Sequence, residues 1–206
     1  MDKEVSQMKI MKPITRHDID HDTDFIYEVN YDGFRALLFW EKDHIKLMSK
    51  QNKDLTAQFP EIVAECLHKQ DLVASELPII LDGEIVILNH DFQANFALIQ
   101  KRGRLKNKER IQQQAKQRPA TFIAFDMLQK AGVNLTSKRL ETRKKALTDF
   151  FQQMKIGNSV SEKLRIIQTY TDIKELKKIV FNYQSEGIIA KRKGSAYHPA
   201  KQHHDW

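Results

Sequence analysis

The sequence predicts an α+β fold with mainly antiparallel sheets flanked by helices. Strand-like and helix-like segments follow one another without the strict alternation that is typical of doubly wound parallel folds. Hydrophobic residues make up 41% of the 206 residues, which is enough for a core, and the low counts of Gly (7) and Pro (5) exclude a disordered or fibrous chain. No internal repeat or linker interrupts the pattern, so we expect a single domain over residues 1–206.

The N-terminal part predicts three strands joined by short turns. Residues 25–30 alternate bulky and small side chains, residues 34–40 are aromatic and aliphatic, and residues 44–48 follow a polar turn. Asp32 and Gly33 form the first turn. We expect the three strands to pair in sequence as an antiparallel meander.

A helix on this sheet and a further strand come next. Residues 59–67 carry apolar side chains at helical spacing, with Thr56 as the candidate cap and Pro60 in the first turn. Residues 79–88 form a strongly apolar strand. It is interrupted by three residues that cost stability in a strand and therefore indicate a functional reason: Asp82, Gly83 and Glu84.

The rest of the chain shows the same two periodicities. Short apolar runs indicate strands, and apolar stripes at a spacing of three or four residues indicate helices. The expected elements, in order, are a short helix over 95–101, a polar helix over 107–117, a strand over 120–128, a helix over 140–151, a short strand over 164–167, a helix over 172–183 and a last strand over 187–191.

Cysteine usage and hydropathy predict a cytoplasmic protein. Cys66 is the single cysteine, so the chain forms no internal disulfide, as expected in a reducing compartment. Residues 1–13 lack the apolar core of a signal peptide, and no run of about 18 apolar residues is present. We therefore expect neither secretion nor membrane insertion.

The positive charge of the chain is clustered. The formal net charge is +7. Residues 101–118 hold eight basic side chains against the single acid Glu109. Such a run could bind along the phosphate backbone of a nucleic acid, with an affinity that falls steeply with salt. A solvated helix face without a partner explains the same run about equally well. The basic residues are Lys101, Arg102, Arg104, Lys106, Lys108, Arg110, Lys116 and Arg118.

Acidic residues lie near the ends of three of the expected apolar strands. If these strands are neighbours, their carboxylates converge, and hard oxygen ligands of this kind suit Mg²⁺ held together with substrate phosphates. A turn cap or a surface ion pair remains an alternative for any single one. As a set they predict a nucleotide pocket, and they are Glu28, Asp32, Asp82, Glu84 and Glu186.

Four short motifs occur in a specific order. They are Asn30-Tyr31-Asp32-Gly33-Phe34-Arg35, Leu81-Asp82-Gly83-Glu84-Ile85-Val86, Ala124-Phe125-Asp126 and Glu186-Gly187-Ile188-Ile189-Ala190-Lys191. This order resembles that of the covalent nucleotidyltransferases, which comprise ATP-dependent DNA ligases, RNA ligases and mRNA capping enzymes. With the flanking segments Tyr27-Glu28-Val29, Gln100 to Arg104 and Tyr197-His198-Pro199, the chain looks most like bacterial ATP-dependent DNA ligases of the end-joining type, from about Met11 to Trp206.

The resemblance implies a nucleotidyltransferase (adenylation) domain with the ATP-grasp-like ligase fold, using ATP and Mg²⁺ in DNA repair. The implied partners are nicked or broken double-stranded DNA, other end-joining proteins and a C-terminal OB-fold domain, which we expect to be absent from this chain. RNA ligases and capping enzymes use the same chemistry and remain an alternative. A GTP preference would indicate a capping enzyme, whereas Glu28 indicates ATP.

Asn30 stands where the family has the lysine that attacks the α-phosphate of ATP. The nucleophile must be an amine with a free lone pair, and the amide nitrogen of asparagine lacks one. We therefore expect no self-adenylation through position 30. Asn30 is either an introduced residue or a natural variant, and a native asparagine would favour a non-catalytic nucleotide- or DNA-binding repair module.

The remaining roles follow from the resemblance residue by residue. Glu28 would accept a hydrogen bond from the adenine amino group, and Phe125 would stack on the base. Asp32 would orient position 30, while Lys191 would contact the α-phosphate. The catalytic set is therefore Asn30, Asp32 and Lys191, the nucleotide-binding set is Glu28, Asn30, Arg35, Glu84, Phe125, Glu186 and Lys191, and the metal set is Glu84 and Glu186.

Two segments depart from the family pattern. Ser49-Lys50-Gln51-Asn52 replaces Ser-Arg-x-Gly, and Pro199 to His203 replaces Pro-Gly-x-Arg-Ser. The C-terminal histidines His198, His203 and His204 have no flanking ligand pattern, so we expect a frayed tail rather than a metal site.

Overall fold

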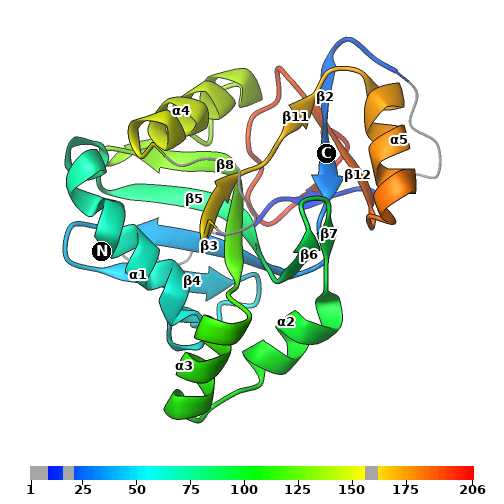
Figure 1. Cartoon of the computed structure of the whole chain (residues 1–206). Coiled ribbons are helices and arrows are strands. Elements are labelled where there is room, and N and C mark those ends of the chain that lie inside the picture. The colour runs from blue at the N-terminus through cyan, green and yellow to red at the C-terminus, as the bar shows by residue number, and fades with distance from the viewer. Residues whose placement is uncertain (1–8, 16–20, 156–161) are drawn as a thin grey trace.

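The computed structural model describes residues 9–15, 21–155 and 162–206, and its larger sheet has the strand order β10-β8-β5-β3-β4, with β9 paired to β8 (Figure 1). Every pairing between its described strands is antiparallel except β8 with β10, which is parallel. This confirms the predicted mixed fold with mainly antiparallel sheet. The strands are β3 (Phe34–Trp40), β4 (Ile45–Ser49), β5 (Ile79–Val86), β8 (Thr121–Lys130), β9 (Val133–Asn134) and β10 (Leu164–Ile166).

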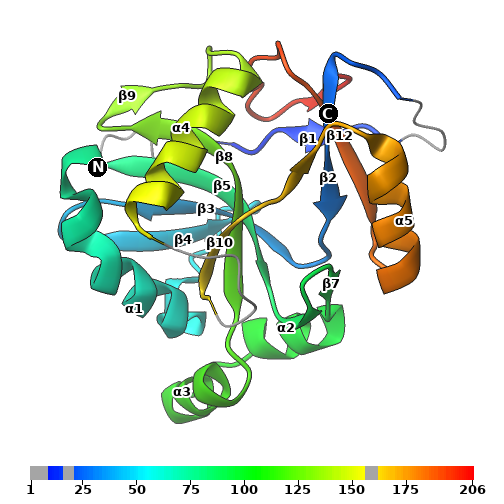
Figure 2. The same cartoon turned by 45° about the horizontal axis from the view of Figure 1, so that its top comes forward.

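Helices α1 (Pro60–Lys69) and α4 (Leu140–Gln153) cover one face of this sheet (Figure 2). The alternating side chains of β3 that include Leu38 and Trp40 point toward them. Trp40 packs edge-on against Phe150 of α4, with ring centroids 5.8 Å apart. Burial of these side chains supplies the main hydrophobic core.

The second sheet has β2 (Phe25–Asn30) between β11 (Thr169–Tyr170) and β12 (Gly187–Arg192). Helix α5 (Ile173–Tyr183) covers it, with Leu176 packed against Tyr27 and Val29. The predicted meander is therefore wrong at its first strand, because β2 pairs with β11 and β12 while only β3 and β4 form a hairpin. The apolar side chains of β2 need the cover that α5 provides, so the chain crosses between the sheets at residues 31–33.

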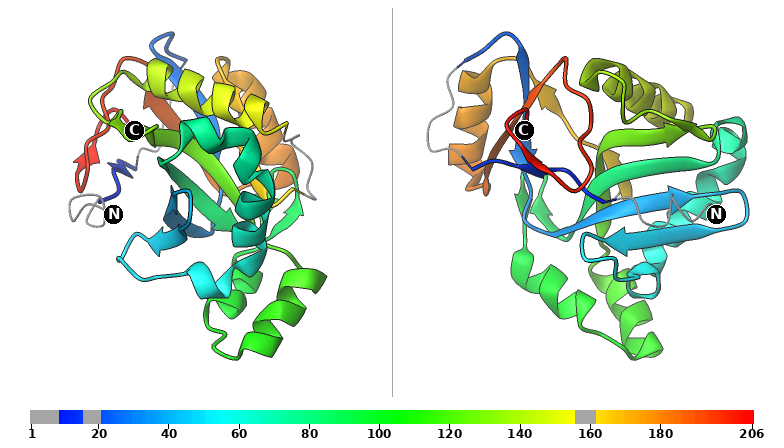
Figure 3. Two further views of the ribbon diagram at one scale, coloured as in Figure 1. Left: turned by 90° about the vertical axis from the view of Figure 1, so that its left-hand side faces the viewer. Right: turned by 180° about the vertical axis from the view of Figure 1, so that it is seen from behind.

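The two ends of the described chain meet on the face away from α1 and α4. Strand β1 (Lys12–Pro13) pairs in parallel with β13 (Gln202–His203), as seen from behind in Figure 3. Trp206 is buried against a cluster that includes Met11 and Phe125. The expectation of a frayed tail is wrong, since this apolar cover and the β1 pairing order the segment.

Side-chain caps start three helices where the sequence places a polar residue. Asn95 caps α2 (Phe96–Gly103), Asn107 caps α3 (Lys108–Gln117) and Asp172 caps α5. The prediction that Thr56 caps the helix after it is wrong. Thr56 begins a 3₁₀ turn, and its hydroxyl accepts a hydrogen bond from the backbone N–H of Leu47 instead.

Among the described residues no helix has the length and apolar character needed to cross a membrane.

Helices α2 and α3 project from the sheets together with the hairpin of β6 (Leu88–His90) and β7 (Gln93–Ala94) (Figures 1 and 2). Ile111 is the one buried residue of α3, so this helix is solvated on most of its surface.

Gly83 is required where β5 passes over Phe122 of β8. A Cβ atom at this position would lie 2.5 Å from the Phe122 ring and 2.6 Å from the carbonyl oxygen of Ile123. We expect Gly83→Ala to lower the free energy of unfolding by about 1 to 3 kcal/mol in urea denaturation, because the ring and the strand must shift. Gly187→Ala is the control, since nothing lies within 4 Å of its added Cβ. Equal stability of the two variants would contradict this packing.

Candidate functional site

The eight residues to which the resemblance gives a catalytic, nucleotide-binding or metal role each line one of two adjoining cavities between the sheets. The larger cavity has a volume of about 600 Å³ and the smaller about 60 Å³. Asn30, Arg35 and Glu84 line both cavities. Asp32 and Glu186 line the larger one, whereas Glu28, Phe125 and Lys191 line the smaller one.

Three carboxylates face the larger cavity from different elements. Asp32 lies on the crossing between the sheets, Glu84 on β5 and Glu186 just before β12. Burial raises the pKa of Glu84 to about 8, with the charges of Asp82 and Asp32 adding to the effect. Burial and the charge of Glu186 raise the pKa of Asp32. Among the described residues no ion pair joins these three carboxylates to a basic side chain.

Glu28 lies between two lysines at the floor of the smaller cavity. Its carboxylate is 2.6 Å from the Nζ of Lys144, on α4, and 2.6 Å from the Nζ of Lys191, on β12. Burial alone would raise the pKa of Glu28, but the two ammonium groups outweigh it and hold the pKa below its usual value. Burial lowers the pKa of Lys191. A base can meet Glu28 only after one of these lysines has shifted.

Phe125 is covered by the chain's own cations. The guanidinium carbon of Arg35 lies 4.2 Å from the ring centroid and the Nζ of Lys191 4.3 Å from it. Trp206 packs edge-on against the same ring. The remaining 60 Å³ holds only a few water molecules, so a stacked base would have to displace these side chains.

Asp82 does not belong to the converging carboxylates. Its two oxygens accept hydrogen bonds from the Nε and Nη2 of Arg35, at 2.7 and 2.8 Å. The hydroxyl of Tyr197 donates to the same carboxylate at 2.6 Å. The expectation that Asp82 joins the converging carboxylates of a nucleotide pocket is wrong, because both of its oxygens are used in holding Arg35. Tyr197 belongs to the segment Tyr197-His198-Pro199, but nothing in the sequence indicates its hydrogen bond to Asp82.

A second buried ion pair with two hydrogen bonds involves Asp126, the residue after Phe125 on β8. Asp126 pairs with Arg143 of α4 through bonds of 2.9 and 2.8 Å, and both side chains are fully buried. Arg143 also donates to the carbonyl oxygens of Lys138 and Ser195. It thus joins α4, β8 and the C-terminal segment, and neither Arg143 nor Lys144 was foreseen from the sequence.

The basic run divides into two parts. Arg102 is buried and makes bonds of 2.8 and 2.7 Å to the carboxylate of Glu61 on α1. The expectation that it faces a nucleic acid is wrong, because this pairing uses its guanidinium inside the fold. The other seven basic residues are exposed on α2, α3 and their flanking loops: Lys101, Arg104, Lys106, Lys108, Arg110, Lys116 and Arg118.

The pKa of Glu84 predicts a pH-dependent stability. Because its folded value of about 8 lies above the ordinary 4.5, the folded chain binds this proton more tightly than the unfolded chain. The resulting stability is full below about pH 4.5 and is lost as the pH rises through 8. Since the side chain is partly exposed, we expect the unfolding free energy of the unmodified chain to fall relative to Glu84→Gln by on the order of 2 kcal/mol between pH 5 and 8.5.

Urea denaturation at several pH values measures this difference. Glu141→Gln serves as the control, because the Glu141 side chain is half exposed and pairs with Arg139 at the surface. Parallel pH profiles for the unmodified chain and Glu84→Gln would contradict the raised pKa.

Comparisons with known proteins identify a family model, relatives and solved structures that resemble this chain. A family model described as ATP dependent DNA ligase domain matches residues 6–206. The bifunctional non-homologous end joining protein LigD of Bacillus subtilis is 34% identical over 200 residues, which cover 95% of this chain and 33% of that protein. DNA ligase C of Mycobacterium tuberculosis is 29% identical over 87% of this chain and 48% of that protein. The chain thus spans a third to a half of the length of these curated relatives.

A solved structure shows the same fold. The mycobacterial DNA ligase D complexed with ATP and MES superposes with a TM-score of 0.71 at 23% identity, covering 98% of this chain and 59% of that chain.

Proposed function

The chain belongs to the family of ATP-dependent DNA ligase domains, and on this basis we propose that it binds ATP between its two sheets without transferring AMP onto itself. The observation that carries the proposal is the gathering of all eight predicted site residues around two adjoining cavities. The smaller cavity would open to take the base between Phe125 and Glu28. The phosphates would extend toward Asn30 and the carboxylates of the larger cavity.

The charged groups suit this orientation. Lys191 already lies over Phe125, so it can move toward the phosphates when a base replaces it on the ring, whereas Asp82 holds Arg35 at the edge of both cavities. Glu84 and Glu186 would hold Mg²⁺, which supplies charge neutralisation at the phosphates. Asn30 ends β2 opposite Gly187 of β12, and it lines both cavities, as the residue next to an α-phosphate must.

Calorimetric titration tests nucleotide binding directly. With Mg²⁺ present we expect ATP to bind, and GTP to bind at least about tenfold more weakly, because Glu28 accepts from the amino group of adenine but not from the carbonyl of guanine. Phe125→Ala should weaken ATP binding by about tenfold or more through loss of stacking. Phe181→Ala, an exposed aromatic on α5, is the control. Absence of binding by either nucleotide would refute the proposal.

The DNA surface proposed for this domain is the seven-residue exposed part of the basic run on α2 and α3 and their flanking loops. These helices project from the sheets, as Figures 1 and 2 show. A cluster of exposed lysines and arginines binds phosphates with a steep salt dependence. Nicked or broken duplexes are the proposed partners, in agreement with the end-joining relatives.

A second candidate is a repair module that binds nucleotide or DNA and has no catalytic step. It is favoured by Asn30 and by the closure of the base pocket by Arg35 and Lys191. Sealing of a 5′-phosphorylated nick by the unmodified protein in the presence of ATP and Mg²⁺ would exclude this candidate, and it would also contradict the absence of self-adenylation proposed above.

A further inference from the structure

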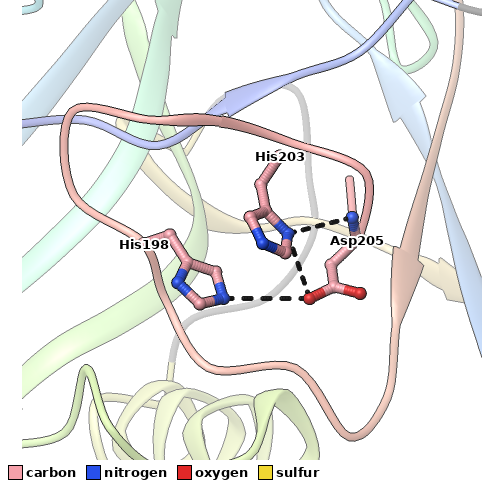
Figure 4. Close-up of side chains that lie close together, drawn as sticks. All are labelled: His198, His203 and Asp205. Atoms are coloured by element: carbon pink, nitrogen blue, oxygen red, sulfur yellow. Dashed lines mark hydrogen bonds and ion pairs between the residues drawn. The ribbon is translucent and has the colours of Figure 1, made fainter.

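The C-terminal segment brings three metal-ligating side chains together outside the cavities described above. His198, His203 and Asp205 each offer one ligand atom, and these atoms all lie within 4.8 Å of one another (Figure 4). It is the one group of three or more His, Cys, Asp or Glu with this spacing in residues 9–15, 21–155 and 162–206. None of the three lines either candidate nucleotide cavity.

The separations between the ligand atoms match a small tetrahedral site. The Oδ2 atom of Asp205 is 3.1 Å from the Nδ1 of His203 and 3.8 Å from the Nε2 of His198. Bonds of about 2.0 to 2.2 Å to a tetrahedral Zn²⁺ place ligand atoms roughly 3.3 Å apart. The two imidazoles are stacked with centroids 4.0 Å apart and an interplanar angle of 17°, so the rings must rotate about their side-chain bonds for both lone pairs to meet at one ion.

The carboxylate of Asp205 is already oriented. The Nδ1 of His203 accepts a hydrogen bond from the backbone N–H of Asp205 at 3.3 Å, so this nitrogen is unprotonated, and a metal ion would take its lone pair in place of that hydrogen bond. The other carboxylate oxygen, Oδ1, accepts from the Nε of Arg192 at 3.1 Å. Arg192 thus holds the carboxylate with Oδ2 facing the histidines, as outer partners of metal ligands do.

We propose that His198, His203 and Asp205 form a binding site for one Zn²⁺ ion. Two imidazole nitrogens and one carboxylate oxygen are a donor set that suits Zn²⁺, whereas Mg²⁺ prefers oxygen ligands alone. The exposed His204 is outside the set, although its Nε2 lies 3.7 Å from Oδ1 of Asp205. Three protein ligands leave a fourth position for water.

Zinc at this site would fix the segment that closes one side of the base pocket. Asp205 is joined to β12 through Arg192, and His203 belongs to β13, which pairs with β1. Trp206 follows directly and lies over Lys191, whose Nζ is 4.2 Å from its ring.

Metal binding is tested on the untagged, metal-free chain by Zn²⁺ titration in competition with a chromophoric chelator. We expect one equivalent to bind, and His198→Gln and His203→Gln each to weaken binding by at least about tenfold. His68→Gln on α1 is the matched control, because His68 is exposed and far along the chain from the cluster. Co²⁺ should give visible absorption bands in the unmodified chain that both cluster variants lack.

Circular dichroism confirms that each variant is folded before titration. Where a histidine variant fails to fold, Asp205→Asn replaces it, because an amide oxygen still accepts from Arg192 but is a weaker ligand for zinc. Binding of less than one equivalent, or equal affinity of the cluster variants and His68→Gln, would overturn the proposal.

Discussion

Replacement of Asn30 by lysine is expected to turn a chain that takes up no AMP into one that carries it covalently. Position 30 is at the end of β2, beside both cavities and two residues from Asp32. A lysine there supplies an amine whose lone pair can attack the α-phosphate, with pyrophosphate leaving. Incubation with ATP labelled at the α-phosphate and Mg²⁺, followed by denaturing electrophoresis, should label Asn30→Lys and not the unmodified chain.

Two control variants distinguish the effect of a nucleophilic amine at position 30 from the effect of a positive charge. Asn30→Arg adds a cation without a nucleophilic amine and should remain unlabelled. Asn30→Lys combined with Lys191→Met should lose most of the label, since Lys191 is the proposed contact of the α-phosphate. A variant Asn30→Lys that binds ATP in calorimetry but acquires no AMP would show that position 30 is not the site of attack.

Arg143→Met is expected to lower the free energy of unfolding by about 3 to 5 kcal/mol. Methionine fills much of the space but leaves the carboxylate of Asp126 buried without its cation, and the carbonyls of Lys138 and Ser195 lose a donor. Because both members of the pair are fully buried, the penalty is not screened by solvent. Urea denaturation at neutral pH measures the difference.

Lys145→Met is the control on the same helix. Its side chain is 77% exposed and pairs with Asp149 one turn away, an arrangement worth a few tenths of a kcal/mol at most. If Arg143→Met were as stable as Lys145→Met, the buried pair of Arg143 and Asp126 would make no net contribution to the free energy of unfolding. A role for Arg143 in holding the C-terminal segment to α4 would then be excluded.

Local features of this fold could be predicted from the sequence, and long-range ones could not. The helices expected over 95–101, 107–117 and 172–183 each begin at the residue that caps them in the structure, although the one cap named from the sequence, Thr56, is wrong. The partners of β2 come from residues 169–170 and 187–192, and nothing in residues 25–30 indicates a strand so far along the chain.

The candidate site shows the same division. The order of the four motifs was enough to anticipate that Glu28, Asn30 and Lys191 meet at one place. It could not show that Lys144 takes the second oxygen of Glu28, because a lysine on an amphipathic helix looks like any solvated residue. Arg102 was misjudged for the same reason, since its partner Glu61 is on another helix.

The parallel pairing of β1 with β13 also bears on how the molecule is made. Met11 and Pro13, which line the larger cavity, are synthesised almost the whole described length of the chain before their partner strand. At ribosomal rates the interval is roughly 10 to 40 s. The candidate nucleotide pocket therefore stays open on the β13 side until the C-terminal segment has been made, and until then the ring of Phe125 lacks the cover of Trp206.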